Sequence, residues 1–374
     1  MKTLFIFLLC LWPTLSFAHK PSDSYLSINI QNNQLSGRWD VALRDLDFAM
    51  GLDNNDDGAI TWGELRSKTV EINRYVFSRL QLSASDKLCS YQEIEMKVDE
   101  HTDGKYAVLF FNGNCGVSDI AEIMIGYRLF ADLDPQHRGL LNLTYGNVSS
   151  TAVLVPGKPA RVFDISANRM PWKEAQDFIY EGIWHIWIGF DHILFLFSLL
   201  IPSVMVYQSA RWQPVAHFNN AFVDVLKVVT AFTLAHSITL SLAVLDVMAL
   251  PSRWVESCIA ASVILAALNN IYPLFTGKRA LLAFTFGLVH GFGFATVLTD
   301  LGLNQSSRLW SLLGFNLGVE IGQFVLVMIF LPIAYQFSRF PLYKPIVLKS
   351  CSLGIAGLAS LWLLERAFDI VVQV

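Results

Sequence analysis

Apolar and polar residues follow different patterns in the two halves of the chain. Between residues 24 and 165, short stretches alternate between apolar and polar positions, and polar turns separate them. A repeat of two residues predicts strands that bury one face, so this half is expected to form a small β-sandwich. The predicted strands are 24–30, 35–43, 93–98, 106–111, 122–130, 140–145 and 160–165.

The second half is apolar without alternation, which predicts helices that cross a membrane. Six stretches can each span about 30 Å of hydrocarbon, and an amphipathic interfacial segment at 171–180 precedes them. The connections expected in the cytoplasm carry seven Lys or Arg residues against three on the opposite side, which places both ends of the mature chain outside. The predicted spans are 182–202, 228–245, 254–274, 280–298, 309–331 and 346–364.

The start of the chain has the features of a secretory signal peptide. Lys2 precedes an apolar run at 4–11, and a small-residue end follows at Ala18. The alternative is an uncleaved signal anchor. The predicted domains are the signal peptide at 1–18, an exported periplasmic β-rich domain at 19–170 and a six-span transmembrane domain at 171–374.

The cysteines divide between the two halves in a way that fits export. Cys89 and Cys115 lie in the polar half, which export would place in an oxidising compartment, so they are expected to form a disulfide. Cys258 and Cys351 lie in apolar stretches and are expected to be small packing residues.

One polar insertion matches a calcium-binding EF-hand loop over residues 53–64. Loop positions 1, 3 and 5 carry side-chain oxygens, position 6 is Gly58, and position 12 carries a carboxylate. A hard cation such as Ca²⁺ takes a run of oxygen ligands of this kind. Segments 42–52 and 62–80 are expected to be the flanking helices, and the alternative is an Asp- and Asn-rich surface turn. The expected calcium ligands are Asp53, Asn55, Asp57, Ala59 and Glu64.

The composition supports a chain with one half in water and the other half in a membrane. Of its 374 residues, 53% are hydrophobic and 16% are charged, against about 25% charged in a soluble domain. Residues 19–170 hold 20 Asp or Glu and 15 Lys or Arg, whereas residues 171–374 hold 11 of each. With a net charge of −4 and no basic block, nucleic-acid binding is excluded.

Several polar residues fall inside the predicted spans, where such groups usually mark function. Counted along each helix, three histidines and one glutamate lie about 12–16 Å into their spans, near the midplane. Asp191 adjoins the first histidine, and His185 lies two turns earlier. Imidazole and carboxylate together suit Ni²⁺, Co²⁺, Zn²⁺ or Fe²⁺, so they predict a metal or proton site; the alternative is a structural polar network. The midplane residues are His192, His236, His290 and Glu320.

Five blocks of the second half resemble the HupE/UreJ family of membrane proteins, in its branch with an exported N-terminal domain. They are HIWIGFDHILF (185–195), FTLAHSITLSLA (232–243), ESCIAAS (256–262), FGLVHGFGFA (286–295) and FNLGVEIGQ (315–323). The resemblance implies a nickel or cobalt permease of the bacterial inner membrane. The metal-handling residues that it implies are His185, Asp191, His192, His236, His290 and Glu320.

Two other functions fit the same residues. Three histidines around Zn²⁺ could activate water in an intramembrane hydrolase, with Ser237 as an oxyanion donor. A metal-stabilised membrane scaffold that presents the exported domain is the other alternative. A transporter rather than an enzyme is the main prediction. The expected partners are the lipid bilayer, a divalent transition metal, and either a periplasmic metal-delivery protein or further copies of the chain.

Overall fold

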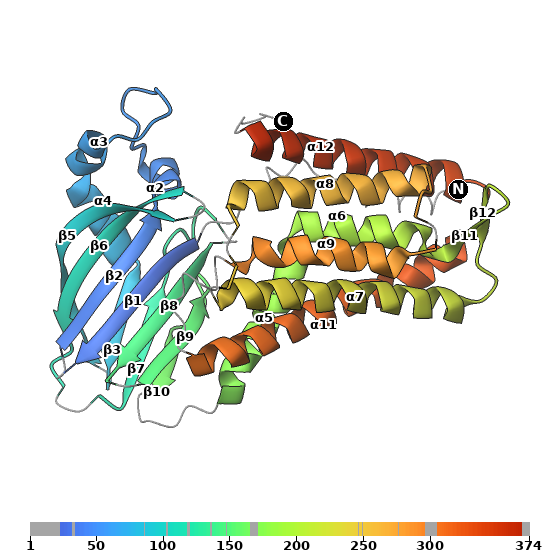
Figure 1. Ribbon diagram of the computed structural model, residues 1–374. Helices are drawn as coiled ribbons and strands as arrows, with labels where there is room; N and C mark the ends of the chain where they lie inside the picture. The colour runs from blue at the N-terminus through green and yellow to red at the C-terminus, as the bar shows by residue number, and fades with distance from the viewer. Residues whose placement is uncertain are drawn as a thin grey trace.

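Two regions of different architecture lie end to end in the computed structural model, a β-rich region and a bundle of helices (Figure 1). The structure describes residues 23–368 except 32–33, 86, 102–103, 118–119, 135–136, 147, 165–170, 246, 249, 276 and 296–304. The predicted signal peptide and the predicted boundary near residue 170 lie outside the described residues, so both stay predictions.

Two sheets form the N-terminal region and share one hydrophobic core. The described strands form a mixed six-stranded sheet, ordered β5-β6-β2-β1-β8-β9, and an antiparallel four-stranded sheet, ordered β10-β7-β3-β4. In β1, Leu26, Ile28 and Ile30 are buried because alternate side chains point to the same face. The predicted β-rich fold is thus confirmed. The strands are β1 (Asp23–Gln31), β2 (Gln34–Ala42), β3 (Leu80–Ala84), β4 (Lys87–Leu88), β5 (Ser90–His101), β6 (Gly104–Asn114), β7 (Glu122–Tyr127), β8 (Arg138–Tyr145), β9 (Val148–Leu154) and β10 (Arg161–Asp164).

The segment between β2 and β3 is helical around a loop. Helix α2 (Leu43–Met50) precedes residues 53–61, and α3 (Trp62–Ser67) and α4 (Thr69–Phe77) follow them. The second helical segment ends before residue 80, where Leu80 and Leu82 join the core as part of β3. Within the β-rich region, β3, β4 and β9 are the described strands that the sequence pattern does not predict.

The chain is also covalently linked across two neighbouring strands. A disulfide joins Cys89, just before β5, to Cys115, just after β6. These strands are paired in the register that sets Ser90 opposite Asn114. The bond therefore staples the two strand ends that lie next to each other.

The second half forms helices that lie roughly side by side (Figure 1). A short hairpin, β11 (Met205–Gln208) and β12 (Arg211–Pro214), and a π-helical segment at Tyr343–Cys351 lie between them. The helices are α5 (Pro171–Ile188), α6 (Phe190–Leu200), α7 (Phe218–Val244), α8 (Ser252–Ile271), α9 (Arg279–Gly293), α11 (Gln305–Phe337) and α12 (Ser352–Phe368).

Within the described residues, four helices are long and apolar enough to cross a membrane, or five if the bent pair α5–α6 is one span. They are Phe218–Val244, Ser252–Ile271, Arg308–Phe337 and Tyr343–Phe368. The prediction of a helical membrane region is confirmed. The described residues contain four or five helices that can span a membrane, fewer than the predicted number of about six.

Two of the predicted spans differ in detail. The stretch 182–202 is not one straight helix, because the chain bends by 71° between α5 and α6. Helix α9 has 15 residues, fewer than the roughly 20 that cross a bilayer. The predicted interfacial segment at 171–180 is the first half of α5 rather than a separate element.

Small residues let α5 and α11 pack closely. Gly314 and Gly318 face the backbone of α5, where an added Cβ would overlap the carbonyl oxygens of Ala175 and Ile179. Gly322 follows at the same spacing of four residues and lies against Ile183. This stripe explains why α5 lies along α11 instead of at the membrane surface.

The β-rich region and the helices share a buried cluster at their junction. Tyr25 and Tyr106 from the strands pack in the same cluster as Phe178, Leu240 and Leu312 from three helices. Opposite this junction, the β11–β12 hairpin lies at the other end of the bundle (Figure 1). The β-rich region therefore covers one end of the helices.

Candidate metal centre

Three histidines from three helices come together inside the bundle. His185 lies near the end of α5, His192 near the start of α6, and His236 in α7. One ring nitrogen of each lies within 4.8 Å of the others. Metal–nitrogen bonds are about 2.1 Å long, so small side-chain adjustments would let one ion contact all three rings.

The break between α5 and α6 brings the first two histidines together. His185 and His192 lie on either side of Gly189, and their ring centroids are 4.6 Å apart. A Cβ at Gly189 would lie 2.9 Å from His192 Nδ1 and 3.2 Å from Asp191 Oδ1. The backbone there has φ −71°, so glycine is required by space and not by conformation.

Asp191 orients the ring of His192, and its carboxylate is not a fourth member of the three-histidine group. Its Oδ1 lies 2.9 Å from His192 Nδ1 and also accepts the His192 backbone N–H at 2.8 Å. Asp191 is in the first turn of α6, where the helix dipole stabilises a carboxylate. A carboxylate that accepts Nδ1–H leaves Nε2 free to bind a metal, a common arrangement around metal-binding histidines.

Several ring nitrogens of this group lack a hydrogen-bond partner among the described residues. Buried side-chain nitrogens normally find one, because an unpaired buried polar atom costs about 1–3 kcal/mol. His236 is fully buried, yet within the described part of the chain neither of its ring nitrogens is hydrogen-bonded. The buried ring nitrogens without a partner among the described residues are His185 Nε2, His192 Nε2, His236 Nδ1 and Nε2, and His290 Nδ1.

His290, on α9, lies beside the three-histidine group. Its ring centroid is 5.2 Å from that of His192, and its Nε2 is 2.9 Å from Ser262 Oγ on α8. The sequence pattern gives Ser262 no distinguishing feature. A serine in an apolar helix has the same signal as any small packing residue, so the pattern alone could not have found it.

Two other predicted residues are placed differently. Glu320 on α11 accepts a hydrogen bond from Thr230 Oγ1 at 3.1 Å, and its carboxylate is not part of the three-histidine group that the described residues form. Ser237 donates its hydroxyl hydrogen to the carbonyl of Thr233 at 2.7 Å. Ser237 thus has no second hydrogen for an oxyanion.

Phenylalanine rings cover the cluster toward both ends of the bundle. On the side of the β-rich region, Phe294 and Phe315 stack with centroids 4.3 Å apart, and both contact the ring of His185. On the side of the β11–β12 hairpin lies a second layer of phenylalanine rings. Each of three cluster histidines has one of these phenylalanines three or four residues away on its own helix. The centroids of neighbouring rings in this layer are 5.2 and 5.8 Å apart. This second layer is Phe195, Phe232 and Phe286.

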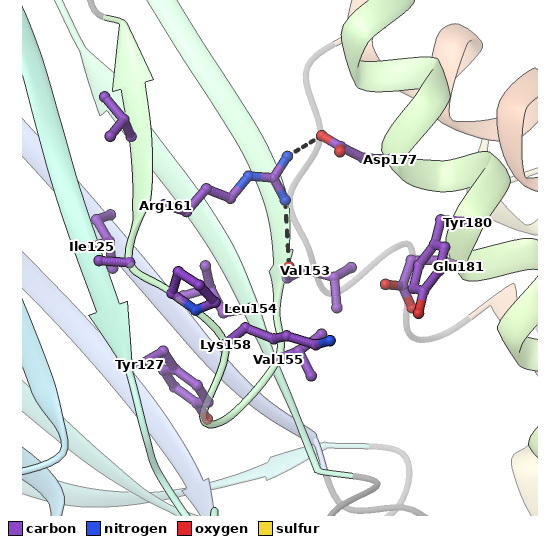
Figure 2. A pocket seen from close by; sticks show the side chains of 13 residues that line it. Ile125, Tyr127, Val153, Leu154, Val155, Lys158, Arg161, Asp177, Tyr180 and Glu181 are labelled. Atoms are coloured by element: carbon purple, nitrogen blue, oxygen red, sulfur yellow. Dashed lines mark hydrogen bonds and ion pairs between the residues drawn. The ribbon is translucent and has the colours of Figure 1, made fainter.

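A separate pocket of about 430 Å³ lies at the junction of the two regions. It is bounded by β7, β9, β10 and α5, and Arg161 on β10 forms an ion pair there with Asp177 on α5 (Figure 2). Glu181 and Tyr180 of α5 line the same pocket, one turn before His185. The pocket is lined by none of the four histidines.

The predicted calcium loop has a compact conformation between α2 and α3. Asp53 accepts hydrogen bonds from the backbone N–H groups of Asp57 and Gly58, and Gly58 has φ +81°. Glu64 accepts from the hydroxyl and backbone N–H of Thr61, and these bonds hold the pKa of Glu64 below its usual value. The carboxylate at loop position 12 is therefore ionised at neutral pH.

Comparison with known proteins identifies the family of the chain. A family model described as HupE / UreJ protein matches residues 162–366, more than half of the 374 residues. The chain belongs to the HupE/UreJ family, which is associated with the handling of divalent metals such as nickel and cobalt. No curated protein matches it.

Proposed function

We propose that this chain is a permease for a divalent transition metal, which it binds at the histidine cluster. One observation carries the proposal: three buried histidines and the partly buried His185 bring together five buried ring nitrogens that have no partner within the described residues. A neutral imidazole has one lone-pair nitrogen, so the four rings offer up to four lone pairs, which a cation would satisfy. Imidazole nitrogen selects Ni²⁺, Co²⁺, Zn²⁺ or Cu²⁺ over Mg²⁺ and Ca²⁺.

Two features favour movement of the metal over chemistry on a substrate. The cluster lies between two layers of phenylalanine rings, as expected of a site that opens to one side at a time. The hydrolase alternative needs an oxyanion donor, but Ser237 already uses its hydroxyl hydrogen on Thr233. A permanently bound metal in a scaffold remains an outcome of the transport test.

The test is metal binding and uptake by the full-length protein. Wild type in lipid vesicles is expected to bind about one Co²⁺ or Ni²⁺ per chain and to move it across the bilayer, with His192→Ala losing both. His217→Ala is the matched control, because His217 is exposed at the start of α7 and away from the cluster. Equal binding and uptake by wild type and His192→Ala would contradict the proposal, and binding without uptake would favour the scaffold.

The proposed orientation follows from the signal peptide and from the basic residues. The β-rich region would lie in the periplasm of a bacterium with the helices in the inner membrane. The end with the β11–β12 hairpin, which carries Arg211, would face the cytoplasm. A periplasmic donor protein or a further copy of the chain would then meet the protein on its β-rich side.

The loop at residues 53–64 is proposed to bind Ca²⁺ in a structural role. The glycine turn and the ionised Glu64 support this, and helices flank the loop as in an EF-hand. Glu64→Gln should weaken Ca²⁺ binding by the full-length protein, whereas Glu71→Gln, an exposed glutamate on α4, should not. Because the pKa of Glu64 is lowered, this ligand stays ionised as the pH falls through the usual glutamate range, and its protonation should weaken binding only at lower pH. Unchanged Ca²⁺ affinity in Glu64→Gln would reject the site.

A further inference from the structure

The hydroxyl group of Ser262 makes two short contacts at the edge of the histidine cluster. Its Oγ is 2.6 Å from the carbonyl oxygen of Ile259, one turn earlier on α8. The same Oγ is 2.9 Å from Nε2 of His290 on α9. Ser262 and His290 are 3% and 1% exposed, so water does not compete for these bonds.

Counting hydrogens fixes the direction of both bonds. A carbonyl oxygen can only accept, so the one hydrogen of the serine hydroxyl goes to Ile259. Ser262 Oγ must then accept from His290, which requires a hydrogen on Nε2. In a neutral ring the other nitrogen, Nδ1, carries the lone pair, and this is the atom that is buried without a partner in the described structure.

His192 is held in the opposite tautomer. Asp191 accepts from its Nδ1, which leaves the lone pair on Nε2. The two rings are 5.2 Å apart between centroids and each keeps one lone pair with no partner in the described part of the chain. A hydroxyl and a carboxylate thus set two neighbouring imidazoles so that each presents one free nitrogen.

We propose that Ser262 is a positioning residue of the metal centre, which fixes His290 in the Nε2–H tautomer and makes Nδ1 a ligand. The inference rests on the proposed metal site. It adds His290 as a fourth imidazole to His185, His192 and His236, and its ring must move toward them because it lies outside the group whose nitrogens are within 4.8 Å of one another. Asp191 then acts through His192 rather than on the ion, and a site of neutral nitrogens favours borderline metals such as Ni²⁺ and Co²⁺ over oxygen-seeking cations.

Two measurements on the full-length protein test this role. The ¹⁵N NMR spectrum of histidine-labelled, metal-free protein reports the tautomer of His290, whose signals are assigned by their loss in His290→Ala. Titration with Co²⁺, followed by its visible absorption, reports affinity and coordination. Ser262→Ala should abolish the preference for Nε2–H and weaken Co²⁺ binding by about 10- to 100-fold with a changed spectrum.

Matched variants separate this role from general packing. Ser262→Thr keeps the hydroxyl and should restore the tautomer and most of the affinity. Ser257→Ala removes a partly exposed serine of α8 that also bonds back to a carbonyl, that of Arg253, and should change neither measurement.

The outcomes distinguish this inference from the proposed function. If His290 is Nε2–H in both wild type and Ser262→Ala, or if Co²⁺ affinity and spectrum are the same in both, the positioning role is overturned. If wild type binds no Co²⁺ at all, the proposed function fails. The tautomer of His290 in metal-free wild type and Ser262→Ala then decides alone what Ser262 does.

Discussion

Two fully buried histidines show how differently the two regions treat polar groups. His137 in the β-rich region and His236 in the helices are each 0% exposed. His137 Nε2 lies 2.5 Å from the hydroxyl of Tyr127, which lies 2.7 Å from Ser24 Oγ, which accepts from Trp39 Nε1 at 3.2 Å. Burial raises the pKa of Tyr127 well above its usual value, so the hydroxyl keeps its hydrogen as a donor.

Among the described residues, no such chain of hydrogen bonds surrounds His236, although the side chain of Asn316 lies close to its ring. Neither ring nitrogen of His236 has a hydrogen-bond partner among the residues described, although the ring is as buried as that of His137. In the β-rich region, the polar side chains around His137 bond to one another and so stabilise the fold. In the histidine cluster, ring nitrogens have no such partner within the described residues, and a site that binds an external ligand needs unpaired atoms of this kind.

The strongest test replaces each of these two histidines with leucine. His236→Leu should weaken Co²⁺ binding by more than about 100-fold, because a ligand is lost and not only its support. It should cost the metal-free protein less stability than His137→Leu does, because the ring of His236 makes no hydrogen bond of good geometry within the described residues and has only the side chain of Asn316 close to it. His137→Leu should do the reverse and keep Co²⁺ binding.

The loss of stability in His137→Leu is expected to be about 1–3 kcal/mol, since the buried hydroxyl of Tyr127 loses one of its two partners and keeps only Ser24. Hydrogen exchange measures it locally, through faster exchange in β1 and β8, whose side chains flank this chain of bonds. The comparison breaks down if His236→Leu destabilises the metal-free helices as much as His137→Leu destabilises the strands.

A smaller effect is expected from adding a side chain at Gly189, which lies between α5 and α6. Gly189→Ala would press a methyl group against His192 Nδ1 and Asp191 Oδ1, and should weaken Co²⁺ binding by about tenfold by turning the ring. Gly354→Ala is the control, because a Cβ at Gly354 on α12 meets nothing within 4 Å. Equal Co²⁺ affinity in both variants would show that the Asp191–His192 pair does not depend on the space at Gly189.

The smallest effect is expected at the junction between the two regions. Arg161→Ala removes the ion pair with Asp177, whose side chains are 29% and 33% exposed, so the loss should stay below about 1 kcal/mol. Lys158→Ala, in the same pocket but without an ion pair in the described structure, should have no effect (Figure 2). Limited proteolysis near β10 measures the difference, and a large loss of protection in Arg161→Ala would mean that this contact holds the regions together.

The pattern of the sequence predicted the parts of the fold that depend on periodicity. Alternation located β1, β2 and β6 because each buries one face in a common core. It missed β3, since Leu80–Ala84 is buried at four of five positions and only two residues separate it from the end of a helix. A short, mostly buried strand has no period to detect.

The sequence predicted how far along its span each site residue lies, but not the direction in which its side chain points around the helix axis. Counting residues along each span placed His192 and His236 at one level, and the structure brings them together. The same count placed Glu320 there as well, but it gives no rotation about the helix axis, and Glu320 pairs with Thr230. The bend at Gly189 and the hydroxyl of Ser262 depend on contacts between helices, which the order of residues along one helix does not contain.

The two layers of phenylalanine rings have a consequence for the cell that carries the protein. Ring pairs such as Phe294–Phe315 and Phe195–Phe232 leave apolar surface on both sides of the histidine cluster. Water does not form a continuous file through such a constriction, so protons cannot hop along it. A membrane could therefore hold many copies of this chain and still store energy as a proton gradient.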